Sequence, residues 1–138
     1  SANKVAYKDF AHSPSKVSAT TKAVKAQYPD RKLIACLELH TYSSLNAEFL
    51  KEYQGALDAA DVAVVFYSPD AVKIKRLEEV TYDQIAQSFQ REDLIIYTNP
   101  TEFKDFLFSQ NLENSALLLM SSGNYGGLNF DEVKELIN

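Results

Sequence analysis

Short apolar runs alternate with amphipathic segments along the whole chain, and this alternation is the feature that most limits the possible folds. Residues 32–39 (KLIACLEL) are almost continuously apolar, which is typical of a strand that is buried on both faces. The other runs that we interpret as strands cover residues 4–8, 61–67, 94–97 and 115–120. Strands that alternate with helices require crossover connections, which favour a parallel sheet with helices on both faces.

Helix-start signals stand between the predicted strands. Ser13-Pro14 predicts a helix that runs to about Tyr28, because serine suits the capping position and proline the first helical position. Asn99-Pro100 is a second signal of this kind, and the apolar residues of its helix are Phe103, Phe106 and Leu107. The last helix is predicted over residues 129–137, with these side chains facing inward: Val133, Leu136 and Ile137.

The middle of the chain is predicted in two parts. Ser43 and Ser44 are expected to open a helix whose apolar side chains follow a helical period: Leu45, Phe49, Tyr53 and Leu57. Residues 70–80 are predicted to form a loop, with an edge strand over residues 72–75 as the alternative, and residues 81–89 a short helix. The whole pattern predicts an α/β, Rossmann-like three-layer domain with a mostly parallel sheet of five to six strands and helices on both faces.

Length and composition restrict the class of protein. The 138 residues fit one domain, which we place at residues 3–138. A net charge of −5 argues against non-specific nucleic-acid binding, and no apolar run approaches the roughly 20 residues of a membrane span. The one cysteine, Cys36, cannot form an internal disulfide, and no leader opens the sequence. We therefore expect a cytoplasmic protein without nucleic-acid or membrane partners.

Three of the predicted strands end in residues that are suited to ligand binding. In an open parallel sheet, ligands bind at the carboxyl ends of the strands. These ends are residues 9–16, 38–44 and 121–127, and both histidines of the chain lie in them. The first helix has no acidic residue in its opening turn, so its positive end is free to meet an anion. From the residues alone, we expect an α/β domain that binds an anionic ligand.

Other chemistries are excluded by missing motifs. The sequence has no GxxxxGK[ST] phosphate-binding loop, no GxSxG nucleophile elbow and too few histidines and cysteines for a zinc site. The glycine turn at residues 123–127 has two interpretations, a tight turn that allows close helix–sheet packing or a ligand contact. Asp131 and Glu132 stand in the first turn of the helix after it, which disfavours a phosphate site there.

The stretch Asp9-Phe10-Ala11-His12-Ser13-Pro14, followed by a lysine-rich helix, resembles the start of the C-terminal domain of the Mur ligases. The motif of that family has the form D-[YF]-[GA]-H-x-P. Mur ligases are ATP-dependent enzymes that build the peptide of bacterial peptidoglycan in cell-wall biogenesis. The resemblance implies that ATP phosphorylates the lactyl carboxylate of UDP-N-acetylmuramate, and that an amine attacks the acyl phosphate to form an amide.

The resemblance also implies that this chain is the third domain of such an enzyme. In the family, ATP and Mg²⁺ are bound mainly by a central domain and the UDP-sugar by an N-terminal domain, and neither is recognisable in this sequence. The third domain closes over the reaction centre and presents the amine substrate. We therefore expect no catalytic residue and no metal ligand in this chain, and no activity from the domain alone.

Residues 120–128 (MSSGNYGGL) resemble the M-S-x-G-x-[FY]-G-G-[IL] segment of one branch of the family. That branch joins the tripeptide L-Ala-γ-D-Glu-meso-diaminopimelate to UDP-N-acetylmuramate in peptidoglycan recycling. The alanine-adding branch carries two arginines after the second strand, where this chain has Thr41 and Ser44. The tripeptide branch also carries an arginine nearby, where this chain has His40. The alternatives are the alanine-adding ligase and a free-standing module that binds a nucleotide or sugar phosphate.

The resemblance assigns expected roles to individual residues. Asp9 is expected to bind the nucleotide by reaching the ribose of ATP. The residues that we expect to bind the amine substrate lie on the same rim: Phe10, His12, His40, Ser44, Gly123 and Asn124. The expected partners are UDP-N-acetylmuramate, the peptide, and the N-terminal and central domains of the same protein.

Overall fold

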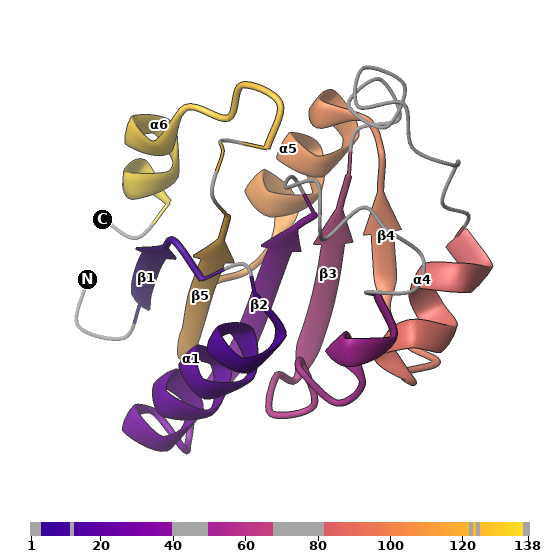
Figure 1. Ribbon diagram of the computed structural model, residues 1–138. Helices are drawn as coiled ribbons and strands as arrows, with labels where there is room; N and C mark the ends of the chain where they lie inside the picture. The colour runs from indigo at the N-terminus through magenta and orange to yellow at the C-terminus, as the bar shows by residue number, and fades with distance from the viewer. Residues whose placement is uncertain are drawn as a thin grey trace.

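The computed structural model describes residues 4–11, 13–39, 50–67, 82–121, 123 and 125–136. Within these residues, five parallel strands form one sheet in the order β1-β5-β2-β3-β4, as Figure 1 shows. The strands are β1 (Lys4–Asp9), β2 (Lys32–Glu38), β3 (Val62–Phe66), β4 (Ile95–Tyr97) and β5 (Ser115–Met120). The predicted α/β fold with a parallel sheet is confirmed, and the last strand along the chain is inserted between the first two.

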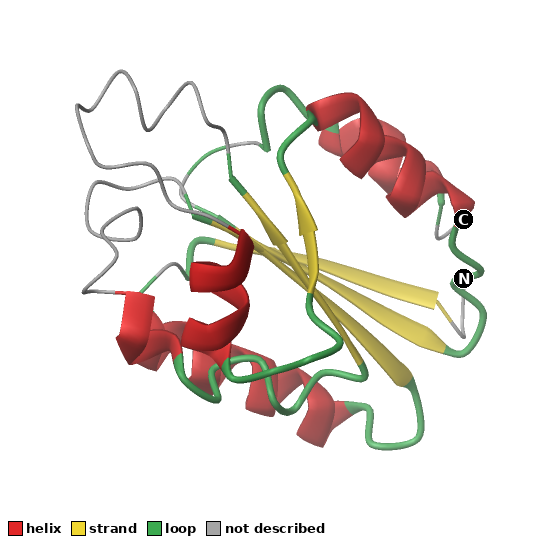
Figure 2. Cartoon of the chain, turned by 90° about the vertical axis from the view of Figure 1, so that its right-hand side faces the viewer, coloured by secondary structure: helices red, strands yellow, loops and turns green. Residues whose placement is uncertain are grey.

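Helices cover both faces of the sheet, so the predicted three layers are present (Figure 2). On one face lie α1 (Pro14–Gln27), the short 3-10 helix η2 (Lys51–Tyr53) and α4 (Tyr82–Phe89). On the other lie α5 (Pro100–Ser109) and α6 (Phe130–Glu135). In the part of the chain that is described, no helix is both long and apolar enough to cross a membrane.

The core has two halves that share the central strands. Alternate residues of β2 point to opposite faces: Leu33 and Leu37 belong to the cluster under α1, and Ile34 and Cys36 to the cluster under α5. All six residues of β5 are buried as well. The near-continuous apolar runs of the sequence therefore reflect strands that are covered on both faces. Burying each such aliphatic side chain contributes about 1.5 to 3 kcal/mol.

Helix starts follow the predicted signals with one difference. The side chains of Asn99 and Asn129 accept hydrogen bonds from backbone N–H groups in the first turns of α5 and α6. Ser13 occupies the capping position of α1, and Pro14 the first helical position, but the serine side chain makes no capping hydrogen bond. The start of α1 therefore depends on backbone geometry and on proline rather than on the serine hydroxyl.

The predicted helix through Leu57 is wrong at its C-terminal end. Helical geometry stops after Tyr53, because Gly55 has a φ of 74°, which no right-handed helix allows. Tyr53 and Leu57 are nevertheless both buried, so the apolar spacing predicted burial correctly although the backbone turns between them. The predictions for residues 43–49 and 70–80 lie outside the described residues, and the short helix predicted at residues 81–89 is α4.

Asp61 joins four segments at the amino-terminal edge of the sheet. Its Oδ2 accepts hydrogen bonds from the backbone N–H of Leu33 (2.7 Å) and from Lys25 Nζ (2.8 Å). Arg91 donates to the carbonyl oxygens of Leu57 (2.7 Å) and Asp61 (3.1 Å). Burial alone would raise the pKa of Asp61, but the Leu33 N–H and Lys25 outweigh burial and lower it.

We predict that Asp61→Ala lowers the free energy of unfolding by about 1 to 2 kcal/mol, because the Leu33 N–H loses its acceptor and Lys25 its partner. Urea unfolding at pH 7 measures this loss. Since the folded-state pKa is lowered, the contribution is complete above about pH 4 and disappears as the pH falls through that pKa. Asp105→Ala, which removes an exposed acid from α5, is the matched control and should leave stability unchanged.

Candidate functional site

The carboxyl ends of β1, β5 and β2 lie side by side. In the parallel register, Asp9 of β1 and Leu37 of β2 both pair with Met120 of β5. The backbone N–H of Ser121 extends the ladder by donating to the carbonyl oxygen of Asp9 at 3.0 Å. From here the chain leaves β1 toward α1 on one face and β5 toward α6 on the other. Such a divergence is where open α/β sheets bind ligands.

Asp9 and Phe10 lie at the end of β1. The Asp9 carboxylate accepts a hydrogen bond from the backbone N–H of Ala11 at 2.7 Å, which turns the chain toward α1. Ala11 is buried in the core, and Phe10 between them is 71% exposed. The turn therefore holds a carboxylate in a fixed orientation and directs a large aromatic ring outward, at the edge where the sequence predicted ligand binding.

A hollow of about 540 Å³ lies beside the start of α1. Its lining residues come from α1 and from the segment around η2: Ser13, Pro14, Ser15, Ser18, Glu52, Gln54 and Ala56. The first turn of α1 contains no acidic residue, as expected. Three serines from the start of α1 therefore line the hollow together with Glu52 from η2.

Glu38 connects the end of β2 to the turn that follows β5. Its side chain is buried, with the residue only 3% exposed, and Oε1 accepts hydrogen bonds from Ser121 Oγ (2.5 Å) and from the backbone N–H of Tyr125 (2.9 Å). Ser121 Oγ in turn accepts the N–H of Gly123 at 2.7 Å. The sequence analysis assigned no role to Glu38. Its one local signal is that an acid ends an otherwise apolar strand.

Tyr125 fixes the glycine turn against the core. Its ring stacks on Phe103 with centroids 4.8 Å apart, and its hydroxyl donates to the carbonyl oxygens of Met120 (2.7 Å) and Cys36 (3.0 Å). Burial first, then the neighbouring Cys36 and Glu38, raise the pKa of Tyr125 well above its ordinary value, so the hydroxyl stays protonated. These contacts favour the packing interpretation of the turn.

Gly126 is required by the geometry of the same turn. Its φ is 74°, and a Cβ at this position would lie 2.7 Å from Cγ of Pro100 at the start of α5. The next residue, Gly127, has a φ of 111° but open space around its Cβ position. The two glycines thus separate the effect of backbone conformation from that of close packing.

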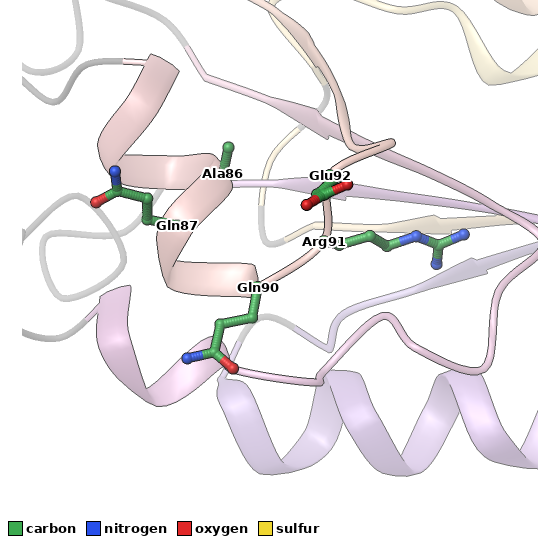
Figure 3. A pocket seen from close by; sticks show the side chains of 5 residues that line it. All are labelled: Ala86, Gln87, Gln90, Arg91 and Glu92. Carbon is green, nitrogen blue, oxygen red and sulfur yellow. The ribbon is translucent and has the colours of Figure 1, made fainter.

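Two further hollows lie away from these strand ends. Figure 3 shows the larger, of about 510 Å³, which is lined by Ala86, Gln87, Gln90, Arg91 and Glu92 near the amino-terminal edge of the sheet. The Arg91 guanidinium there is already bonded to two carbonyl oxygens and to Asp93, so its role is structural. A cleft of about 200 Å³ between β1 and α6 contains Lys8, whose Nζ lies 4.1 Å from the ring centroid of Phe130.

The remaining predicted site residues lie outside the described part of the chain: His12, His40, Ser44 and Asn124. Among the residues that are described, no three His, Cys, Asp or Glu side chains lie close enough together to hold a metal ion.

No family model matches the sequence, but curated proteins do. The UDP-N-acetylmuramate–L-alanine ligase of Sulfurihydrogenibium sp. (strain YO3AOP1) is 29% identical over 119 residues, which are 83% of this chain and 25% of that protein. The ligase of the same name from Limosilactobacillus reuteri is 42% identical over 57 residues, 41% of this chain and 13% of that protein. The chain is therefore similar in sequence and in fold to Mur ligases. It spans about a quarter or less of the length of these relatives.

Solved structures show that the fold is that of a Mur ligase domain. A murein peptide ligase from Psychrobacter arcticus 273-4 superimposes with a TM-score of 0.74 at 17% identity, over 99% of this chain and 28% of that one. The second structure is a domain from a putative UDP-N-acetylmuramate:L-alanyl-γ-D-glutamyl-meso-diaminopimelate ligase of Haemophilus ducreyi. It superimposes with a TM-score of 0.60 at 23% identity, over 98% of this chain and 90% of that one. These matches support the predicted likeness to the C-terminal domain of a Mur ligase. A domain of nearly the same extent has therefore been crystallised by itself.

We predict that Gly126→Ala destabilises this domain more than Gly127→Ala does. The positive φ strains alanine at both positions, and a left-handed backbone such as that of Gly126 costs about 1 to 2 kcal/mol. Only Gly126→Ala adds a clash with Pro100, which costs about 1 to 3 kcal/mol more. Equilibrium unfolding of both variants measures the difference, and equal losses would show that the close approach to α5 has no energetic weight.

Proposed function

We propose that this domain closes over the reaction centre of an ATP-dependent ligase and presents an amine substrate to it. The observation that carries the proposal is the meeting of Asp9, the exposed Phe10 and the Gly123 turn at adjacent strand ends of a Mur ligase fold. Because the chain is about a quarter of the length of such enzymes, its partners would be the N-terminal and central domains of the same protein, in the cytoplasm.

Each described residue at this edge has a role that suits its chemistry. The Asp9 carboxylate, oriented by the Ala11 N–H, would accept hydrogen bonds from the ribose hydroxyls of ATP. Phe10 would cover the substrate and exclude water, since its ring is mostly exposed in this domain alone. His12, His40, Ser44, Gly123 and Asn124 are the other residues that we propose to contact the amine substrate.

ATP and Mg²⁺ would be bound mainly outside this chain. ATP, when bound, supplies the phosphoryl group that activates the lactyl carboxylate of UDP-N-acetylmuramate. The described residues fit a share of the nucleotide site through Asp9, but they contain no cluster of three metal-binding side chains. The contribution of this domain is therefore to orient substrates and to exclude water, and we propose that it has no ligase activity alone.

The amine substrate that we propose is the tripeptide L-alanyl-γ-D-glutamyl-meso-diaminopimelate. Its support is in the sequence, where Thr41 and Ser44 replace the two arginines of the alanine-adding branch. A lone alanine carboxylate would lose the bidentate partners that hold it there. The second candidate is L-alanine, and the observation in its favour is that the curated relatives described above bear the name of the alanine ligase.

We predict that the full-length protein carrying this domain forms an amide from UDP-N-acetylmuramate and the tripeptide, with release of phosphate from ATP. Mass spectrometry of the product, with L-alanine as the competing substrate, measures the choice. Turnover with alanine alone would overturn the tripeptide assignment in favour of the second candidate. No turnover with either amine would overturn the ligase proposal. The 138-residue chain alone is the control and should hydrolyse no ATP.

A further inference from the structure

A buried hydrogen-bond relay joins the exits of two neighbouring strands. Glu38 is the last residue of β2, and Ser121 is the first residue after β5. Glu38 Oε1 accepts hydrogen bonds from the Ser121 hydroxyl and from the Tyr125 N–H. Ser121 Oγ in turn accepts one from the Gly123 N–H. The relay therefore connects Gly123 and Tyr125 of the glycine turn to the end of β2, across the strand boundary.

The relay is unusual because it uses a charged side chain where apolar residues dominate. A carboxylate in a protein interior costs several kcal/mol of desolvation unless hydrogen bonds compensate it. The residues before Glu38 in β2 are all buried and apolar from Leu33 to Leu37, and Tyr125 packs into the same core. An apolar residue at position 38 would fill this space without that cost. Such an apolar residue could not accept hydrogen bonds from the Ser121 hydroxyl and the Tyr125 N–H.

We propose that Glu38 is a positioning residue for the amine substrate. Its carboxylate holds the end of β2 in a fixed placement relative to Ser121, Gly123 and Tyr125, at the edge of the sheet where the amine substrate is proposed to bind. This inference rests on the proposed function, in which that edge contacts the amine. Glu38 itself is buried and acts through Ser121 and Tyr125 rather than by touching substrate.

Two variants of position 38 and one of position 121 change the relay in different ways. Glu38→Gln keeps an oxygen that accepts both hydrogen bonds, so the relay survives in it. Glu38→Leu keeps the approximate volume but leaves the Ser121 hydroxyl and the Tyr125 N–H without this acceptor. Ser121→Ala removes the hydroxyl and leaves the Gly123 N–H without its acceptor. The control is Asp61→Ala, which removes a hydrogen-bonded acid at the opposite edge of the sheet.

The first measurement is amide hydrogen exchange in the 138-residue chain, which does not depend on ligase activity. Glu38→Leu is expected to speed exchange at Tyr125, and Ser121→Ala at Gly123, by about 10-fold or more relative to the amides of β5. Glu38→Gln and Asp61→Ala should leave the ratio of the exchange rates in the turn to those in β5 unchanged. Equal acceleration throughout β5 and the turn in Glu38→Leu would overturn the proposal, because Glu38 would then only add to global stability.

The second measurement is steady-state kinetics of the full-length enzyme. Glu38→Leu is expected to raise KM for the amine substrate about 10- to 100-fold, as displacement of a positioned group by about 1 Å does. KM for ATP and for UDP-N-acetylmuramate should stay unchanged, and Glu38→Gln should behave like the wild type. A loss of kcat that matches Asp61→Ala, with all KM values unchanged, would overturn the proposal.

The two measurements separate this inference from the proposed function. Changed exchange at the turn together with a selective rise in KM supports both. Wild-type enzyme that turns over neither amine would overturn the proposed function and, with it, the assignment of Glu38 to substrate binding. If the enzyme is active and Glu38→Leu leaves its KM for the amine unchanged, the inference about Glu38 is overturned and the proposed function is not.

Discussion

The pairing of β5 between β1 and β2 is the interaction on which the rest of the structure depends. If β1 and β2 were direct neighbours, Asp9 and Glu38 would end adjacent strands, and the end of β5 would not lie between them. With β5 between them, the backbone ladder continues past the strands, from the Ser121 N–H to the Asp9 carbonyl. The chain then diverges to helices on opposite faces. The candidate site is therefore a consequence of strand order, built on β2, which is buried from Leu33 to Glu38, and on β5, which is buried throughout.

Polar and apolar contacts cooperate in the turn after β5. The Tyr125 ring stacks on Phe103 of α5, while its hydroxyl reaches the carbonyl oxygens of Met120 and Cys36. Glu38 accepts the Tyr125 N–H in the same interior. The Tyr125 N–H, the Tyr125 hydroxyl and Glu38 Oε1 each have a hydrogen-bond partner, and satisfied buried polar groups make a network rigid. A rigid turn at a strand end suits a domain whose proposed task is to present one substrate to chemistry performed elsewhere.

The sequence predicted the strands and the helix start at Asn99, because these depend on local patterns of burial and capping. It did not reveal the role of Glu38, since that residue acquires its partners only through the insertion of β5, which no local pattern encodes. The helix end at Gly55 was missed for a related reason. Apolar spacing at Tyr53 and Leu57 predicted burial, and burial does not require a continuous helix.

The most direct test is to locate the backbone amides of the domain that substrates protect from hydrogen exchange. Hydrogen exchange of the full-length protein would be compared with and without UDP-N-acetylmuramate, a non-hydrolysable ATP analogue and the tripeptide. The account predicts protection in peptides that cover residues 4–16 and 117–128, which contain the exits of β1 and β5. Residues 82–93, which form the hollow of Figure 3, should be unaffected. Protection confined to residues 82–93, or none at the strand exits, would contradict it.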